Sequence, residues 1–184
     1  MIYFTSDLHF CHDKPFLYTP RGFSNIDDHD ETIIKNWNSI ITDEDDVYLL
    51  GDLMLNDTAK GLEYIKQLKG KIHIIIGNHD TNTRIALYKT LANVVEVVYA
   101  TQIEYKNRKF YLSHYPMYTN AGETLRYPTQ VLYSLHGHTH QNTNFFNDMF
   151  FIYHVGLDSH NNCPVSIEQV IEDCNAQFNS QLSK

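Results

Sequence analysis

Five short blocks of residues that commonly bind metal ions stand in one ordered series. They are Asp7-Leu8-His9, Gly51-Asp52, Gly77-Asn78-His79-Asp80, Ser113-His114 and Gly137-His138-Thr139-His140. Each block directly follows a short run rich in aliphatic and aromatic residues that is typical of a strand. Strands that end in ligands place them at the carboxyl edge of a sheet, where open α/β folds hold their sites. The series therefore predicts one metal-binding cleft built from several strand ends.

The candidate ligands offer a mixture of oxygen and imidazole nitrogen. They are Asp7, His9, Asp52, Asn78, His114, His138 and His140. Such a mixture suits borderline divalent ions, Mn²⁺ first and Fe, Zn, Ni or Co as alternatives. This set is larger than one ion usually needs, so we expect two ions that share a carboxylate. Asp52, from the middle of the series, is the candidate bridge.

Each block alone also has an ordinary structural interpretation. Gly51-Asp52 is a common turn pair, and the block that begins at Gly77 is rich in turn-forming and capping residues. Gly137-His138-Thr139-His140 is more specific, because alternation in an extended segment would put both imidazoles on one face. Independent turns have no reason to place acids, amides and imidazoles at five successive strand ends. The conjunction therefore favours the metal site.

In this order the blocks resemble the pattern of calcineurin-like metallophosphoesterases, specifically the small single-domain bacterial or phage forms. Flanking segments are similar too: Thr5 to Phe10, Arg21-Gly22-Phe23, Asn36-Trp37-Asn38, His114-Tyr115-Pro116 and Val155-Gly156-Leu157-Asp158. The resemblance covers nearly the whole chain. It implies an α/β fold, a four-layer sandwich of two mixed β-sheets flanked by helices.

The resemblance also implies how the site works. One ion would be held by Asp7, His9, Asp52 and His140, and the other by Asp52, Asn78, His114 and His138. The implied activity is a dinuclear metal-dependent phosphohydrolase, with in-line attack of a metal-bridging hydroxide on a phosphomonoester or phosphodiester. His79, which is left over from coordination, would assist the leaving group, and Asp52 is the second residue expected to be catalytic.

The chain departs from the family pattern beside this site. Many relatives carry an acid that pairs with the catalytic histidine where Leu55 stands here, and the arginine that often follows is missing. Asn56 or Asp57 could substitute, or His79 could lack a partner. Substrate binding would then use other residues, each of which could equally be an ordinary loop residue. The candidates are His12, Arg21, Tyr115 and Arg126.

Composition bounds the remaining possibilities. With 184 residues and 42% hydrophobic content, we expect a single domain over residues 1–184. No long apolar run exists and the chain opens on a strand, so we expect a cytoplasmic protein with no membrane partner. Its three cysteines are widely spaced, which argues against disulfides and thiolate zinc sites. The oligomeric state stays open.

The net charge of −8 disfavours a surface that grips extended duplex nucleic acid. A small phosphorylated substrate, such as a nucleotide, is the expected partner. Two alternatives stay open: a nuclease or RNA-processing phosphodiesterase with the same chemistry, and a non-catalytic metal-binding interaction scaffold.

Sequence periodicity predicts the elements that must position the site. We expect strands at 1–6, 46–50, 71–76, 94–99, 101–106, 109–113, 131–136 and 149–155, and helices at about 26–41, 58–68, 83–91 and 166–178. The first half alternates strand and helix, which is typical of parallel units, and the second half should be more antiparallel. Trp37 is expected in the core, and His29 in the acidic run 27–31 is interpreted as a solvated helix start.

Overall fold

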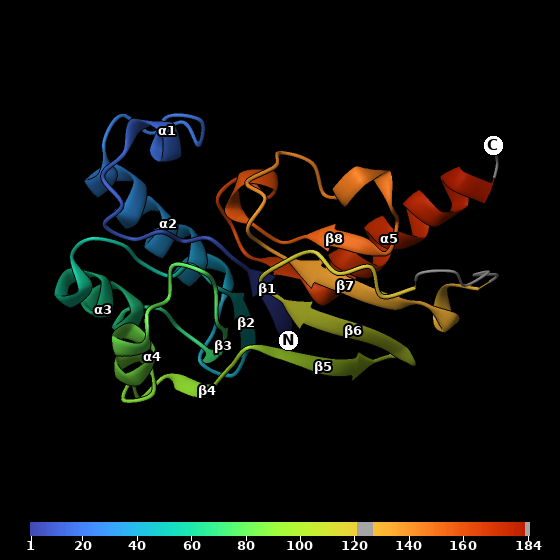
Figure 1. The fold of residues 1–184 in the computed structure, drawn as a ribbon, viewed down its shortest axis with the longest axis horizontal. Coiled ribbons are helices and arrows are strands. Elements are labelled where there is room, and N and C mark those ends of the chain that lie inside the picture. Colours follow the sequence, from blue (N-terminus) through green and yellow to red (C-terminus); the bar gives the residue numbers. More distant parts are fainter. Residues whose placement is uncertain (121–126, 183–184) are drawn as a thin grey trace.

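Parallel strands form most of the first sheet. The computed structural model describes residues 1–120 and 127–182. The strands β1 (Ile2–Thr5), β2 (Asp46–Leu50), β3 (Lys71–Ile75) and β4 (Val94–Val98) run parallel, and β9 (Val165–Ser166) pairs antiparallel with β1, in the order β4-β3-β2-β1-β9 (Figure 1). The carboxyl ends of β1, β2 and β3 therefore meet at one edge.

The second sheet is also mixed. Its strands are β5 (Ala100–Tyr105), β6 (Arg108–Ser113), β7 (Leu132–His136) and β8 (Ile152–His154), in the order β5-β6-β7-β8. Only β5 and β6 pair antiparallel, whereas β6, β7 and β8 run parallel. The second sheet is therefore more antiparallel than the first, as expected, since the first has only the short β1–β9 pairing of this kind. The connections after β6 and β7 nevertheless cross over rather than turn back as hairpins.

Helices cover both sheets, as expected. They are α1 (Pro15–Tyr18), α2 (Ile26–Ile40), α3 (Thr58–Lys66), α4 (Asn82–Tyr88) and α5 (Ile167–Leu182). The side chains of Asn25, Asp57 and Thr81 cap α2, α3 and α4. Sequence periodicity missed α1 and β9, which are too short to show it. No helix in the described part of the chain has the length and apolarity needed to cross a membrane.

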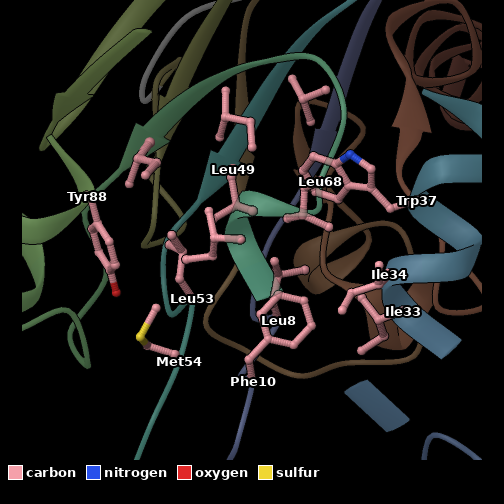
Figure 2. Close-up of a cluster of buried hydrophobic side chains, with 14 of the residues drawn as sticks. Leu8, Phe10, Ile33, Ile34, Trp37, Leu49, Leu53, Met54, Leu68 and Tyr88 are labelled. Carbon is pink, nitrogen blue, oxygen red and sulfur yellow. The ribbon is translucent and has the colours of Figure 1, made fainter. Parts of the chain in front are cut away.

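Two hydrophobic clusters hold these layers together. The first lies between the first sheet and helices α2 to α4, and it contains Trp37 and Leu49, both 0% exposed (Figure 2). The second joins the other face of the first sheet to the second sheet and α5, through residues such as Phe4 and Phe110. The arrangement of two mixed sheets flanked by helices is thereby confirmed, and so is the core position of Trp37.

His29 is not solvated. It is 0% exposed, because its place in the first turns of α2 points the ring inward against the edge of Phe23. Its Nδ1 donates to Asp30 Oδ1 at 2.7 Å, and its Nε2 lies 3.0 Å from Arg21 Nη1. The acidic run is therefore only partly a solvated face, since Asp30 is buried too.

Candidate metal centre

Side chains from both sheets converge at the shared edge. Asp7, His9 and His140 form the first ligand group: His9 Nε2 lies 3.2 Å from His140 Nε2, and Asp7 Oδ1 lies 3.9 Å and 3.8 Å from these two nitrogens. Three side chains that all present a ligand atom to one point could hold a metal ion. The segment after β1 supplies Asp7 and His9, and the segment after β7 supplies His140.

Asn78, His114 and His138 make up a second candidate ligand group. His114 Nε2 lies 2.8 Å from Asn78 Oδ1, and the rings of His114 and His138 are 5.0 Å apart. Asp52 lies between the two groups, because its Oδ2 is 3.4 Å from His114 Nε2 and 3.8 Å from His9 Nε2. Asp7, Asp52 and His114 form a second set that could hold an ion.

The first ligand group has the chemistry that a cation needs. Asp7 is fully buried, and its Oδ1 has no hydrogen-bond partner among the described residues. Burial raises the pKa of Asp7 and lowers the pKa of His9 well below its usual range. A buried carboxylate oxygen without a donor is costly unless a positive charge meets it. These residues therefore fit a divalent ion.

At Asp52 the neighbouring donors affect the pKa more strongly than burial does. Burial alone would raise the pKa of Asp52, but His114 and the backbone N–H of His79 lower it to about 2. Burial would lower the pKa of His114, whereas Asp52, Asp7 and the Leu50 carbonyl raise it to about 9. Asp52 is therefore an anion that attracts positive charge to the point between the two ligand groups.

Several candidate ligands lie on left-handed backbone. Asp7, His9, Asp52, His138 and His140 have φ angles of 57°, 50°, 57°, 68° and 48°. Non-glycine residues rarely adopt this region, and such residues cluster at functional sites. The interpretation of Gly137-His138-Thr139-His140 as extended is therefore wrong. β7 ends at His136, and a tight turn rather than strand alternation brings the two imidazoles to the cleft.

Glycines in the blocks make room for ligands. A Cβ at Gly77 would lie 2.3 Å from Asp52 Oδ1, and one at Gly137 would lie 2.5 Å from Asp7 Oδ2. Any side chain at either position would push a ligand carboxylate away. The sequence interpretation gives Gly77 a role in a turn, but close packing against the carboxylates is the stronger requirement at both positions.

Asp80 and Ser6, which sequence reasoning left without a role, hold Asp52 and Asp7 in place. Asp80 Oδ2 accepts from the backbone N–H groups of Asp52 and Gly77, both at 2.9 Å, and Tyr88 donates to its Oδ1. Ser6 donates its hydroxyl to Asp7 Oδ2. Asp80 thereby ties the turn after β2 to the turn after β3, a long-range link that local sequence does not reveal.

Arg21 and Asp158 support His140. His140 Nδ1 donates to Asp158 Oδ2 at 3.0 Å, which leaves Nε2 for a metal. Arg21 donates Nε and Nη2 to the two Asp158 oxygens, both at 2.9 Å, and Nη2 also to the carbonyl of Asp7. The expectation that Arg21 binds substrate is not supported by this placement, because its side chain is 1% exposed and already bonded.

His79 lies at the mouth of the centre. Its side chain is 45% exposed, its Nε2 lies 4.0 Å from Asp52 Oδ2, and its ring meets the His9 ring edge-on at 5.6 Å. Neither suggested substitute for the missing acid contacts it: Asn56 donates to the Cys11 carbonyl, and Asp57 caps α3. In the described part of the chain, Asp52 is the one carboxylate within ion-pair distance of this imidazole.

The remaining predicted substrate residues lie on two sides of the ligands. The His12 ring is 5.4 Å from the His9 ring, and its buried Nδ1 has no hydrogen-bond partner among the residues described. Tyr115 is 48% exposed, and its ring lies 4.6 Å from that of His138. Arg126 falls outside the described residues. His12 and Tyr115 therefore stay candidates, each beside a different ligand group.

A carboxylate shared by two groups of oxygen and imidazole ligands, at the ends of parallel strands, defines a hydrolase of the two-metal class. Within that class, the chain belongs to the calcineurin-like phosphoesterase superfamily, whose domain profile matches residues 1–156. The family resemblance noted in the sequence is confirmed, and the protein is an enzyme of the phosphoesterase type.

Three known proteins are similar to this chain. It is 34% identical to the uncharacterized protein MJ1445 of Methanocaldococcus jannaschii, over 93% of this chain and 89% of that one. The crystal structure of AQ665, a protein of unknown function from Aquifex aeolicus, matches with a TM-score of 0.69 and 26% identity over 94% of this chain and 98% of that one. A symmetrical bis(5′-nucleosyl)-tetraphosphatase of Buchnera aphidicola is 33% identical, over 47% of this chain and 26% of that one.

Proposed function

We propose that this chain is a dinuclear metal-dependent phosphohydrolase that cleaves a phosphomonoester or phosphodiester bond of a small, nucleotide-like substrate. The position of Asp52 carries the proposal. Its Oδ2 lies 3.8 Å from His9 Nε2, 3.4 Å from His114 Nε2 and 4.0 Å from His79 Nε2. One carboxylate oxygen thus faces both ligand groups and the histidine expected to act on the leaving group.

The proposed division of labour follows from these positions. Two divalent ions, Mn²⁺ by preference, held by the two ligand groups with Asp52 between them, would supply an activated water and neutralise phosphoryl charge. His79 is half exposed beside Asp52, so its ring can reach an oxygen that leaves toward the cleft mouth. Imidazole is well suited to donate that proton near neutral pH, and no nucleophile from the chain is needed.

A small substrate is favoured over a nucleic-acid duplex. The net charge of −8 disfavours a backbone-tracking surface. The Buchnera relative is named for its action on a dinucleoside tetraphosphate, which supports a nucleotide-like substrate here. A nuclease with the same chemistry is the alternative, and cleavage of single-stranded oligonucleotides in preference to small esters would favour it. A cytoplasmic location stays a prediction.

The test is hydrolysis of nitrophenyl phosphate and bis-nitrophenyl phosphate after removal of metal and addition of Mn, Ni, Zn or Mg singly. The protein should be active only with added metal. His79→Ala should lower turnover by roughly 10²–10⁴-fold, the range of general acid catalysis, while metal stoichiometry stays unchanged. His73→Gln is the matched control, because His73 is a histidine on the first sheet that bonds Asp46 and Glu96 and none of the candidate ligands.

Two results would overturn the proposal. One is no turnover of either ester with any metal although two ions are bound, which would favour a binding scaffold. The other is an equal loss of activity in His79→Ala and His73→Gln, because a general loss of folding rather than a catalytic role would then explain both.

A further inference from the structure

An apolar hollow opens directly beside the metal ligand His140. It has a volume of about 220 Å³ and is lined by Phe16, Leu17, Pro20, His140 and Asp158. His140 therefore faces the first ligand group with Nε2 and also forms part of the hollow's wall.

The short helix α1 shapes this hollow. Leu17 and Tyr18 are buried and anchor the helix, whereas Phe16 is 72% exposed. A single exposed phenylalanine is ordinary by itself. This one lies edge-on to the His12 ring at 5.6 Å, and His12 in turn lies 5.4 Å from the metal ligand His9. Two ring contacts thus connect Phe16 to the metal centre.

A second, more polar hollow adjoins the first. It has a volume of about 440 Å³ and shares Pro20, His140 and Asp158 with its neighbour. Its other walls include the amide side chains of Asn142 and Asn161. Together the two hollows fall within the roughly 300–1,000 Å³ that small-molecule sites enclose. An apolar wall with an exposed ring, next to amides, suits a flat ring that carries hydrogen-bonding groups on its edge.

We propose that these two hollows form the specificity site for a nucleobase, with Phe16 stacking on the base and the phosphate of the same molecule at the metal centre. This inference rests on the proposed function and names its substrate class. Aromatic side chains stack on any base, so Phe16 supplies affinity, and the amides of Asn142 and Asn161 supply contacts to the base edge. The His12 ring lies 5.6 Å from the Phe16 ring and 5.4 Å from the His9 ring, so it joins the base-stacking residue to the metal centre.

The test is calorimetric titration of the Mn²⁺-loaded protein with three probes: inorganic phosphate, and the methylene phosphonate analogues of AMP and of ribose 5-phosphate. The phosphonates have no scissile ester, so binding is measured without turnover. For the unaltered protein the AMP analogue should bind on the order of tenfold more tightly than the ribose analogue. Phe16→Ala should remove that difference and leave phosphate and ribose analogue unaffected.

Two controls sharpen the result. Phe16→Trp should keep the preference for the base, because an aromatic ring is retained. Val95→Ala removes another exposed apolar side chain, on the edge strand β4 and outside the lining of both hollows, and should change nothing. Equal affinity for the AMP and ribose analogues, or a preference that survives Phe16→Ala, would overturn the inference. Failure of the proposed function would instead appear as absent turnover of the nitrophenyl esters, whatever the probes do.

Discussion

The two ligand groups meet at Asp52 but are held in different ways. In the first group Asp7 and His9 are buried, and His140 is fixed by Asp158, which is itself held by two bonds from Arg21. In the second group His138 and Asn78 are exposed, and His114 donates its Nδ1 to the backbone carbonyl of Leu50 at 2.8 Å. Side chains support one group, and backbone supports the other.

This difference has a consequence for substitutions outside the ligand set. The carboxylate that orients a metal-binding histidine fixes its tautomer and ring position, and losing it weakens metal binding. Such a carboxylate exists for His140 but not, in the described residues, for His114 or His138. Changes at Arg21 or Asp158 should therefore act on the ion of the first group and spare the other. The predictions below test this asymmetry, from the largest expected effect to the smallest.

Asp52→Asn should damage both groups at once. The amide offers one ligand oxygen and no charge, so it cannot serve two ions as a carboxylate does. We expect bound metal to fall from two ions to at most one. Loss of several kcal/mol of transition-state stabilisation would reduce ester hydrolysis by roughly a thousandfold. Metal analysis of the purified protein and rate assays check this. Asp46→Asn is the control, because Asp46 is the first residue of β2 and lies at the amino end of that strand. Two tightly bound ions in Asp52→Asn would contradict the bridging role.

Arg21→Met should cost the most folding stability. The Arg21 and Asp158 side chains are 1% and 13% exposed, so this substitution removes both guanidinium bonds from a largely buried carboxylate and leaves it only the bond from His140. Breaking such a pair costs about 3–5 kcal/mol, measured as the free energy of unfolding in urea. Lys66→Met is the comparison, because the Lys66 and Glu63 side chains are 52% and 67% exposed. Removing that surface pair should cost less than about 1 kcal/mol. Similar losses in both variants would contradict the structural role of Arg21.

Asp158→Asn should separate the two ions. It keeps the shape of the side chain but weakens the bond from His140 Nδ1, so the ion of the first group should bind roughly 10–100-fold more weakly. The ion of the second group should be unaffected. The metal-free protein is titrated with Mn²⁺, and electron paramagnetic resonance monitors the titration and resolves the two binding steps. Equal weakening of both steps would show that the two groups share one support and would remove the asymmetry.

Sequence reasoning singled out the candidate ligands that the structure brings together because the signal is local. Asp7, Asp52 and Asn78 each follow a strand within a few residues, and parallel pairing of β1, β2 and β3 then brings their ends together. Five blocks in one order made the family recognisable before any contact was known. The same locality explains the prediction of the main strands and helices, whose hydrophobic periods are read from consecutive residues.

The supports of the site escaped prediction because they join distant segments. Arg21 meets Asp158 across most of the chain, and Asp80 fixes the turn that holds Asp52. Nothing in the residues next to Arg21 distinguishes a buried ion pair from a phosphate ligand, and the acidic run around His29 suggested solvent exposure. The left-handed turn at His138 and His140 was also missed, because alternating residues are equally compatible with a strand.

His29→Gln should have the smallest effect on metal binding. It tests whether a residue that contacts Arg21 also helps to hold His140 in place. Among the described residues His29 reaches the centre in two indirect ways: its Nε2 lies 3.0 Å from Arg21 Nη1, and it bonds Asp30, which accepts from the backbone N–H of Cys11. Arg21 keeps its two bonds to Asp158 and its bond to the Asp7 carbonyl without His29, so His140 should stay in place. We expect about 1–3 kcal/mol lower stability, from the imperfectly paired Asp30, with Mn²⁺ affinity nearly unchanged. Urea unfolding and the same Mn²⁺ titration measure the two quantities. A loss of affinity as large as that of Asp158→Asn would mean that the orientation of Arg21, rather than the carboxylate of Asp158 alone, sets the position of His140.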